Sequence, residues 1–98
     1  MLNIGSNKFR PGTKLLLNSK GAKVRLTEKE TAILRYLYRA RSRPVSREML
    51  LQEVWGYNSS VTTHTLETHI YRLRQKIEEE PSEPSILISE AGGYKLLP

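Results

Sequence analysis

The sequence contains no cysteine and no aspartate, so all ten acidic residues are glutamates. Without cysteine the chain forms no disulfide and no thiolate metal site. The two histidines, His64 and His69, lie five positions apart, whereas a helical zinc site takes a pair four positions apart. We therefore expect neither a metal ion nor another cofactor.

Signals of catalysis and of membrane insertion are missing as well. No serine or threonine lies in a nucleophile-elbow motif, and no aspartate is present to orient a histidine. Gly92 and Gly93 are typical of a turn and not of a phosphate-binding loop. No apolar run approaches the roughly 20 residues that span a bilayer, and no signal peptide precedes the domain. We expect a soluble, cytoplasmic domain without enzymatic activity.

What the chain has is positive charge. Its 98 residues make one domain, and 16 lysines and arginines give a net charge of +6 and a pI near 9.8. Such a basic domain favours nucleic acid as its partner, with an acidic membrane surface as the weaker alternative. The charge is also segregated: one segment is rich in arginine (Arg35, Arg39, Arg41, Arg43, Arg47) and another in glutamate (Glu78, Glu79, Glu80, Glu83).

The N-terminal residues 1–26 predict an antiparallel sheet. Residues 1–9, 14–18 and 23–26 have the composition of short strands, and the turn signal Pro11-Gly12 separates the first two. Three such strands cannot bury a face by themselves, so a helical layer must cover them.

Residues 27–78 predict that layer as a core of three helices. Thr27 and Glu30 have the spacing of a capping box at the start of the first helix. Ser46 is a good N-cap for the second. The first helix ends before Pro44, the second covers residues 47–55 and ends at Gly56, and the third covers about residues 63–78 after a cap at Thr62 or Thr63.

The C-terminal residues 85–98 predict a β-hairpin. The preceding residues 79–84 are acidic and contain two prolines, which prevent the helix from continuing. Residues 85–88 and 94–97 then flank a glycine-containing turn. The order of strands, three helices and a hairpin is that of an α+β winged helix-turn-helix domain.

The third helix carries two neighbouring stripes, because side chains advance by about 100° per residue. By itself, the polar stripe fits ordinary solvated surface as well as an anion-binding face. The hairpin that follows and the segregated charge favour a helix that enters the major groove of DNA. The apolar stripe comprises Leu66, Ile70, Leu73 and Ile77, and the polar, basic stripe comprises Thr65, His69, Arg72 and Lys76.

Chemistry suggests a role for each exposed polar residue of this helix. Arg72 can bind a guanine edge through two hydrogen bonds, and Thr65 can contact a phosphate, a base edge or a thymine methyl. Thr62 and Thr63 lie at a helix N-terminus, which favours a phosphate. The cations suited to the DNA backbone are Arg74 and Lys76.

Three residues have a structural alternative. Arg74 lies on the far side of the helix from Arg72, so it can instead pair with Glu67, Glu78 or the acidic segment. His69 either donates to a phosphate or is satisfied within its own helix. Trp55 fits the core better than a stacking platform.

Several motifs occur in a specific order along the chain. They are L-T-E-K-E at residues 26–30, V-S-R-E at 45–48, V-W-G at 54–56, T-L-E-T-H-I-Y-R-L-R at 65–74 and G-G-Y at 92–94. Together they closely resemble the C-terminal effector domain of OmpR/PhoB-type response regulators, over almost the whole chain. The resemblance implies a winged helix with a four-stranded N-terminal sheet, one strand more than the sequence pattern predicts.

The resemblance also implies where DNA and RNA polymerase bind. The third helix enters the major groove, the hairpin near Gly92 reaches the minor groove, and Arg47 and Trp55 touch phosphates. The polymerase-facing loop comprises Gly56, Tyr57, Asn58, Ser59, Ser60 and Val61. The full set of candidate DNA contacts is Arg47, Trp55, Thr62, Thr63, Thr65, Thr68, His69, Arg72, Arg74, Lys76, Tyr94 and Lys95.

Two residues depart from the family pattern. Tyr71 stands where some relatives have a basic residue, and Glu90 stands where a wing arginine reaches the minor groove in some relatives. Because phosphates repel a carboxylate, the wing is left with backbone groups, Tyr94 or Lys95 for contact.

The resemblance implies a bacterial two-component transcription regulator whose phosphorelay acts on a receiver domain absent from this chain. The implied partners are double-stranded DNA with tandem half-sites, a second protomer on that DNA, RNA polymerase and the cognate receiver. The alternative is a winged helix that binds an acidic protein partner through its basic face. Binding to random duplex that does not change with salt would favour this alternative.

Overall fold

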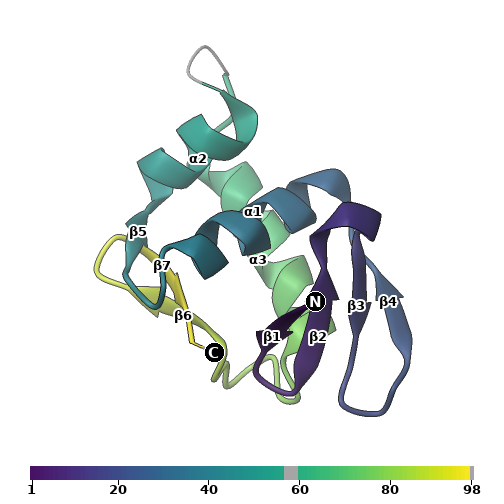
Figure 1. Cartoon of the computed structure of the whole chain (residues 1–98). Helices are drawn as coiled ribbons and strands as arrows, with labels where there is room; N and C mark the ends of the chain where they lie inside the picture. The colour runs from purple at the N-terminus through teal and green to yellow at the C-terminus, as the bar shows by residue number, and fades with distance from the viewer. Residues whose placement is uncertain (57–59, 98) are drawn as a thin grey trace.

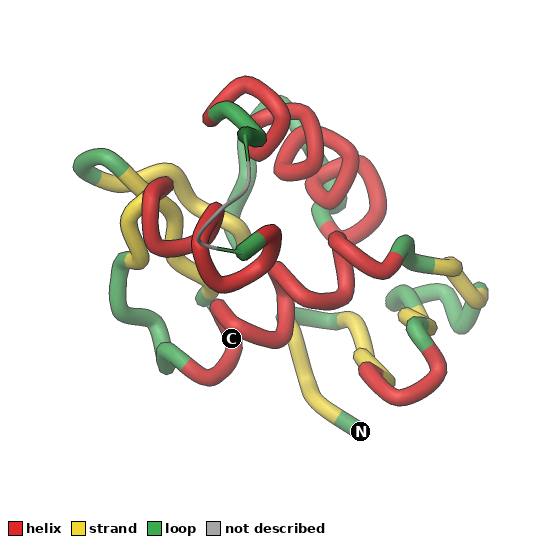
Figure 2. Tube along the Cα trace, turned by 90° about the horizontal axis from the view of Figure 1, so that it is seen from above, coloured by secondary structure: helices red, strands yellow, loops and turns green. Residues whose placement is uncertain are grey.

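The computed structural model describes residues 1–56 and 60–97 and has an α+β architecture. In Figure 1, helices α1 (Glu28–Arg39) and α3 (Thr63–Ile77) lie between an N-terminal sheet and the C-terminal hairpin, and α2 (Arg47–Trp55) lies above them. The view from above in Figure 2 again places the hairpin and the N-terminal strands on different sides of the helices. No helix among the described residues has both the length and the apolar character needed to span a membrane. The predicted winged-helix fold is confirmed.

The N-terminal sheet has four antiparallel strands. The prediction of a single strand over residues 1–9 is wrong, because a turn at Gly5 and Ser6 divides this segment in two. Gly5 has a φ of +59°, a left-handed conformation that favours glycine. The additional strand is the one that the family resemblance implied. In sheet order the strands are β1 (Leu2–Ile4), β2 (Asn7–Arg10), β3 (Leu15–Leu17) and β4 (Lys23–Arg25), with a 3-10 turn η1 (Pro11–Thr13) after β2.

The predicted caps of α1 and α2 are confirmed. In the capping box, the Glu30 N–H donates to the Thr27 hydroxyl over 3.1 Å, and the Thr27 N–H donates to the Glu30 carboxylate over 2.9 Å. The Met49 N–H donates to the Ser46 hydroxyl at the start of α2. Thr62 occupies the N-cap position of α3, but its side chain makes no capping hydrogen bond.

The C-terminal hairpin belongs to a second sheet, which contains a strand that the sequence pattern did not reveal. The two-residue strand β5 (Val45–Ser46) pairs with β7 (Gly93–Leu96), which also pairs with β6 (Leu87–Glu90). A Cβ atom at Gly93 would lie 2.0 Å from the Val45 carbonyl oxygen, so only glycine allows this close approach. The hairpin itself is confirmed, although β6 begins two residues later than predicted.

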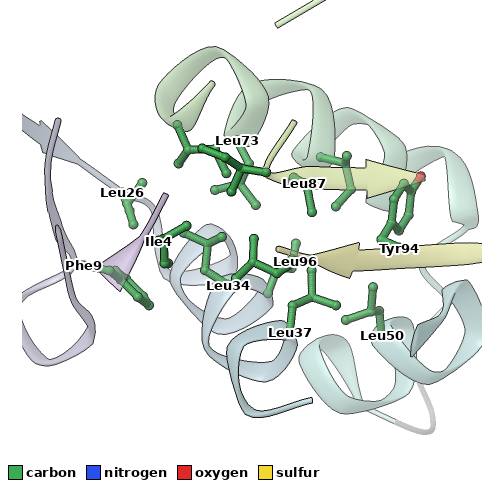
Figure 3. Packing of buried hydrophobic residues seen from close by; sticks show 14 of the residues in the cluster. Ile4, Phe9, Leu26, Leu34, Leu37, Leu50, Leu73, Leu87, Tyr94 and Leu96 are labelled. Carbon is green, nitrogen blue, oxygen red and sulfur yellow. The ribbon is translucent and has the colours of Figure 1, made fainter. Parts of the chain in front are cut away.

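One hydrophobic core joins both sheets to the helices. Figure 3 shows Ile4 and Phe9 of the N-terminal sheet, Leu34 and Leu37 of α1, Leu50 of α2 and Tyr94 of the hairpin around it. The apolar stripe of α3 faces this core, with Leu66, Ile70, Leu73 and Ile77 all buried. α3 is therefore held along its whole length, and its opposite face points outward.

Candidate nucleic-acid interface

The outward face of α3 is exposed and polar. It carries Tyr71, which is 65% exposed, and Arg72 beside it. No described residue forms an ion pair with Arg72. The predicted polar stripe was adjacent to the core, whereas this face lies opposite to it, so only Arg72 belongs to both. We name the outer face of α3 by its exposed residues His64, Glu67, Tyr71, Arg72 and Gln75.

The sequence reasoning did not single out His64 and Gln75 as members of the outer face. The signal was available, since both lie about half a turn from the core stripe on a helical wheel. Thr68 lies between them but is half-buried, and its hydroxyl donates to the His64 carbonyl over 3.1 Å.

The other three members of the predicted stripe, Thr65, His69 and Lys76, are half-buried. The His69 Nδ1 atom is 2.8 Å from the Thr65 carbonyl oxygen, and the His69 ring packs edge-on against Trp55 with centroids 5.1 Å apart. His69 therefore makes its hydrogen bond within its own helix, as the structural alternative predicted. Trp55 is half-buried, as expected, and it joins α2 to α3 through this contact.

Lys76 makes an ion pair with Glu30 of α1. Its ammonium lies 2.6 Å from Glu30 Oε1 and also donates to the Arg25 carbonyl over 3.1 Å. Glu30 is almost fully buried. Burial alone raises the pKa of Glu30, but hydrogen bonds from Lys76 and Thr27 and the charge of Lys76 hold that pKa below its usual value. The sequence identified Glu30 only as a capping residue, so this second role was missed.

Arg74 reaches the hairpin. Its Nε donates to the Leu87 carbonyl and its Nη2 to the Ser89 hydroxyl, each over 3.0 Å. The alternative that Arg74 pairs with Glu67, Glu78 or the acidic segment is wrong, since no such pair forms among the described residues. Arg74 therefore fixes the hairpin relative to α3.

Glu78, which follows α3, also connects this helix to the hairpin. Its buried carboxylate accepts from the backbone N–H groups of Ser85, Ile86 and Leu87 over 2.7–3.1 Å. These hydrogen bonds hold the chain that leads into β6 against the end of α3.

Tyr94 brings two predicted contact residues together. The guanidinium carbon of Arg47, at the start of α2, lies 5.1 Å from the centroid of the Tyr94 ring, and that of Arg74 lies 5.9 Å from it. Two cations from different helices thus converge on β7, at one edge of α3. Two predicted DNA contacts, Arg47 and Arg74, thus form a half-buried basic cluster. The predicted contact Tyr94 is itself buried in the core, with 3% exposure.

A second basic group lies at the end of α2. The Lys29 ammonium donates to the Val54 carbonyl over 3.0 Å and lies 5.6 Å from the centroid of the Trp55 ring. Lys29 was not among the sequence candidates, because its distance from Trp55 in the chain gave no signal.

The wing carries an ion pair of its own. Lys95 lies 2.8 Å from Glu90, across the β6–β7 hairpin. Glu90 therefore partly neutralises the cation that was expected to carry the wing contact. Both side chains are partly exposed, so the pair itself contributes little to stability.

The remaining sequence candidates lie at the start of α3 and in the loop before it. Thr62 and Thr63 are exposed. Gly56 and Ser60 are exposed and Val61 is half-buried, whereas Tyr57, Asn58 and Ser59 of the predicted polymerase-facing loop lie outside the described residues. Over residues 1–56 and 60–97, no three His, Cys, Asp or Glu side chains gather as metal ligands would.

Comparisons with a family model and with known proteins both place this chain among transcriptional regulators. Residues 21–96 match the family model described as "Transcriptional regulatory protein, C terminal". The chain is 43% identical over 76 residues to the transcriptional regulatory protein KdpE of Mycobacterium tuberculosis. The aligned residues cover 76% of this chain and 34% of that protein. The chain spans about a third of the length of the curated relatives that it matches.

Solved structures agree with this family. The response regulator DrrB of Thermotoga maritima, an OmpR/PhoB homologue, superposes with a TM-score of 0.84 at 28% identity, covering 97% of this chain and 43% of that one. The DNA-binding domain of CpxR from E. coli superposes with a TM-score of 0.77 at 28% identity, covering 97% and 93%. The chain therefore belongs to the transcriptional regulatory protein C-terminal family, the winged-helix effector domains of OmpR/PhoB-type response regulators.

Proposed function

We propose that this domain binds double-stranded DNA sequence-specifically, as the effector part of a bacterial two-component transcription regulator. The observation that carries the proposal is the outer face of α3. Its polar side chains project from a helix whose other face is anchored by four buried residues. A rigid helix about 10–12 Å wide fits the major groove of B-DNA.

In this arrangement the outer face of α3 reads the bases. Arg72 is suited to a guanine edge, and Gln75 to an adenine edge. Tyr71 offers a ring for a thymine methyl and a hydroxyl for a phosphate or base, in place of the basic residue of some relatives. The half-buried Thr65, Thr68 and His69 lie at the flanks of this face and are nearer to the DNA backbone.

The two basic groups at the edges of α3 serve the phosphates. Arg47 and Arg74 converge on Tyr94 at one edge, and Trp55 lies with Lys29 at the other. Thr62 and Thr63, with the N–H groups at the start of α3, add a site for a phosphate. We leave Lys76 out of the proposed contacts, because its ammonium is bound to Glu30.

We propose that the wing lies along the minor groove and contributes less to DNA affinity than α3 does. The Glu90 carboxylate stands beside Lys95, so little net positive charge is available there. Because Tyr94 is buried in the core, the hairpin can contact the groove through its backbone groups but not through an arginine-like insertion.

The wider function that we propose follows from the family. The domain acts in the cytoplasm and catalyses no reaction. Two copies bind tandem half-sites, and a receiver domain in the full-length protein controls them by phosphorylation. Residues 56–61 between α2 and α3 are proposed to meet RNA polymerase.

The test is to select bound sequences from a pool of random duplexes and then to measure affinities by fluorescence anisotropy. We expect one enriched half-site, and an affinity that falls steeply as salt is raised. Arg72→Ala should weaken binding to the selected duplex by about 1–3 kcal/mol and relax one base preference. Arg35→Ala removes an equal charge from the exposed side of α1 and should leave that preference intact.

Two outcomes would contradict the proposal. Equal losses on selected and random duplex for Arg72→Ala would remove its base-reading role. Binding to random duplex that stays constant with salt, together with no enriched sequence, would favour the acidic-protein partner instead.

A further inference from the structure

The N-terminal sheet and its turns carry the whole net charge of the domain. Residues 1–27 contain six lysines and arginines and no glutamate, and the other ten basic residues of the chain are balanced by its ten glutamates. Protein surfaces usually mix charges of both signs, but this part of the chain does not. Its six cations are Lys8, Arg10, Lys14, Lys20, Lys23 and Arg25.

Four of these cations lie on the outer face of the sheet. Residues paired across neighbouring strands point to the same face, as do residues two positions apart in one strand. The pairing of β2, β3 and β4 therefore places two rows on this face, in which a half-buried leucine of β3 stands between two exposed cations. The rows are Lys8, Leu17 and Lys23, and Arg10, Leu15 and Arg25. We call the four cations Lys8, Arg10, Lys23 and Arg25 the cationic grid.

The spacing of the cationic grid suits an extended polyanion. Strand geometry separates the cations within one strand by about 7 Å and those on β2 and β4 by about 10 Å. None of the four forms an ion pair with a described residue. Double-stranded DNA carries one negative charge per about 1.7 Å of its axis. Its backbone is therefore dense enough to place several phosphates over the grid at once.

The cationic grid is separate from the outer face of α3. The inner face of the sheet contributes Ile4, Phe9 and Leu16 to the core, and Figure 3 shows the first two there. The outer face is therefore turned away from the helices. In Figure 1 the sheet and the hairpin lie on different sides of α1 and α3. A duplex bound along α3 and the hairpin can therefore leave the grid open to a second anion.

The composition of this face favours nucleic acid over a membrane or a protein. Elements that lie on a membrane surface bury large apolar side chains in it. Among the large apolar side chains that are exposed in the described residues, only Met1 adjoins this sheet, at its edge. Protein–protein interfaces are depleted of lysine, whereas phosphate contacts use lysine and arginine.

We propose that the cationic grid binds the phosphate backbone of a second stretch of double-stranded DNA while α3 reads its half-site. This inference rests on the proposed function. Contacts with phosphates carry no sequence information, so the second stretch is bound without sequence preference. Binding of this kind has a Kd of about 1–100 µM at physiological salt. The grid therefore acts mainly on DNA that is already close, and it lets one domain hold two stretches of duplex together.

The experiment measures energy transfer between two short duplexes. A donor-labelled duplex carries the selected half-site and saturates the outer face of α3. An acceptor-labelled duplex of random sequence is then added, so that a signal arises only when one complex holds both duplexes. For the wild type we expect capture of the second duplex, with a slope of about −3.6 for log affinity against log salt if all four cations contact phosphates.

Two variants with the same change in net charge test the position of the site. Lys8→Glu/Lys23→Glu reverses one row of the grid and should weaken capture of the second duplex at least about tenfold and roughly halve its salt slope. Arg35→Glu/Arg39→Glu, on the exposed side of α1, is the matched control and should change capture much less. Both variants should keep the circular dichroism spectrum and the unfolding midpoint of the wild type, since all four side chains are exposed.

Each other outcome would overturn the second DNA site. Absence of energy transfer with the wild type bound to its half-site would do so. Equal losses in the two variants would reduce the effect to net charge, and full capture by the lysine variant would place the second duplex elsewhere. Sedimentation with phosphatidylserine vesicles, without capture of DNA, would make this face a membrane contact. Failure of the wild type to bind the half-site duplex would instead overturn the proposed function itself.

Discussion

The flanks and the outer face of α3 both carry basic side chains, but those on the flanks have partners within the fold and those on the outer face are exposed. On its flanks, Lys76 binds Glu30, Arg74 binds the hairpin and His69 packs on Trp55. On its outer face, Tyr71 and Arg72 are exposed. A positive charge on a helix therefore does not by itself define a contact with DNA.

The flanking residues determine where the outer face points. Lys76 connects α3 to α1, His69 connects it to α2, and Arg74 connects it to β6. A binding surface needs such supporting contacts, because a helix that rocks loses the geometry of its base contacts. The residues on the flanks therefore hold α3 in the orientation in which its outer-face side chains point outward.

The largest effect on stability should come from breaking the ion pair between Lys76 and the buried Glu30. Lys76→Met removes the partner of a buried carboxylate, which should lower the free energy of unfolding by about 3 kcal/mol. Urea denaturation followed by circular dichroism measures this. Gln75→Met, one residue away on the outer face, is the control and should change stability by less than about 0.5 kcal/mol. Similar stability losses in both variants would erase the distinction between the two sides.

Arg74→Ala should have an intermediate effect. It leaves the Leu87 carbonyl without its donor, and we expect unfolding to become easier by about 1–3 kcal/mol. The affinity of Arg74→Ala for the half-site should fall less than that of Arg72→Ala. The lost affinity should come mainly from the contacts that the wing makes with DNA, because Arg74 fixes the hairpin. If Arg74→Ala leaves stability unchanged and abolishes binding, Arg74 belongs functionally with Arg72.

The smallest effect should be in the acid dependence of stability. The pKa of Glu30 is held below its usual value in the folded state, so its charged form stabilises the fold above about pH 4.5, and that contribution is lost as pH falls through the folded-state pKa. Glu30→Gln should have a shallower decline of stability below pH 4.5 than the wild type. An unchanged slope in this acid range would show that Glu30 titrates normally.

Much of the fold was predictable because its signals are local. The capping box at Thr27, the cap at Ser46 and the apolar stripe of α3 each depend on residues a few positions apart. The pattern did not reveal β5, because two residues carry no periodicity and only pairing with β7 makes Val45 and Ser46 a strand. Likewise, the turn at Gly5 became evident only through the pairing of β1 with β2.

By itself, the sequence determined that α3 is amphipathic, basic and followed by a hairpin, and its motifs placed the chain in its family. Only the tertiary structure decided which polar residues of α3 are available. The partners of Lys76 and Arg74 are Glu30, 46 positions away, and Leu87, 13 positions away. Helical periodicity orders side chains around one axis, but whether a cation meets a carboxylate or water depends on elements that only folding brings alongside that axis.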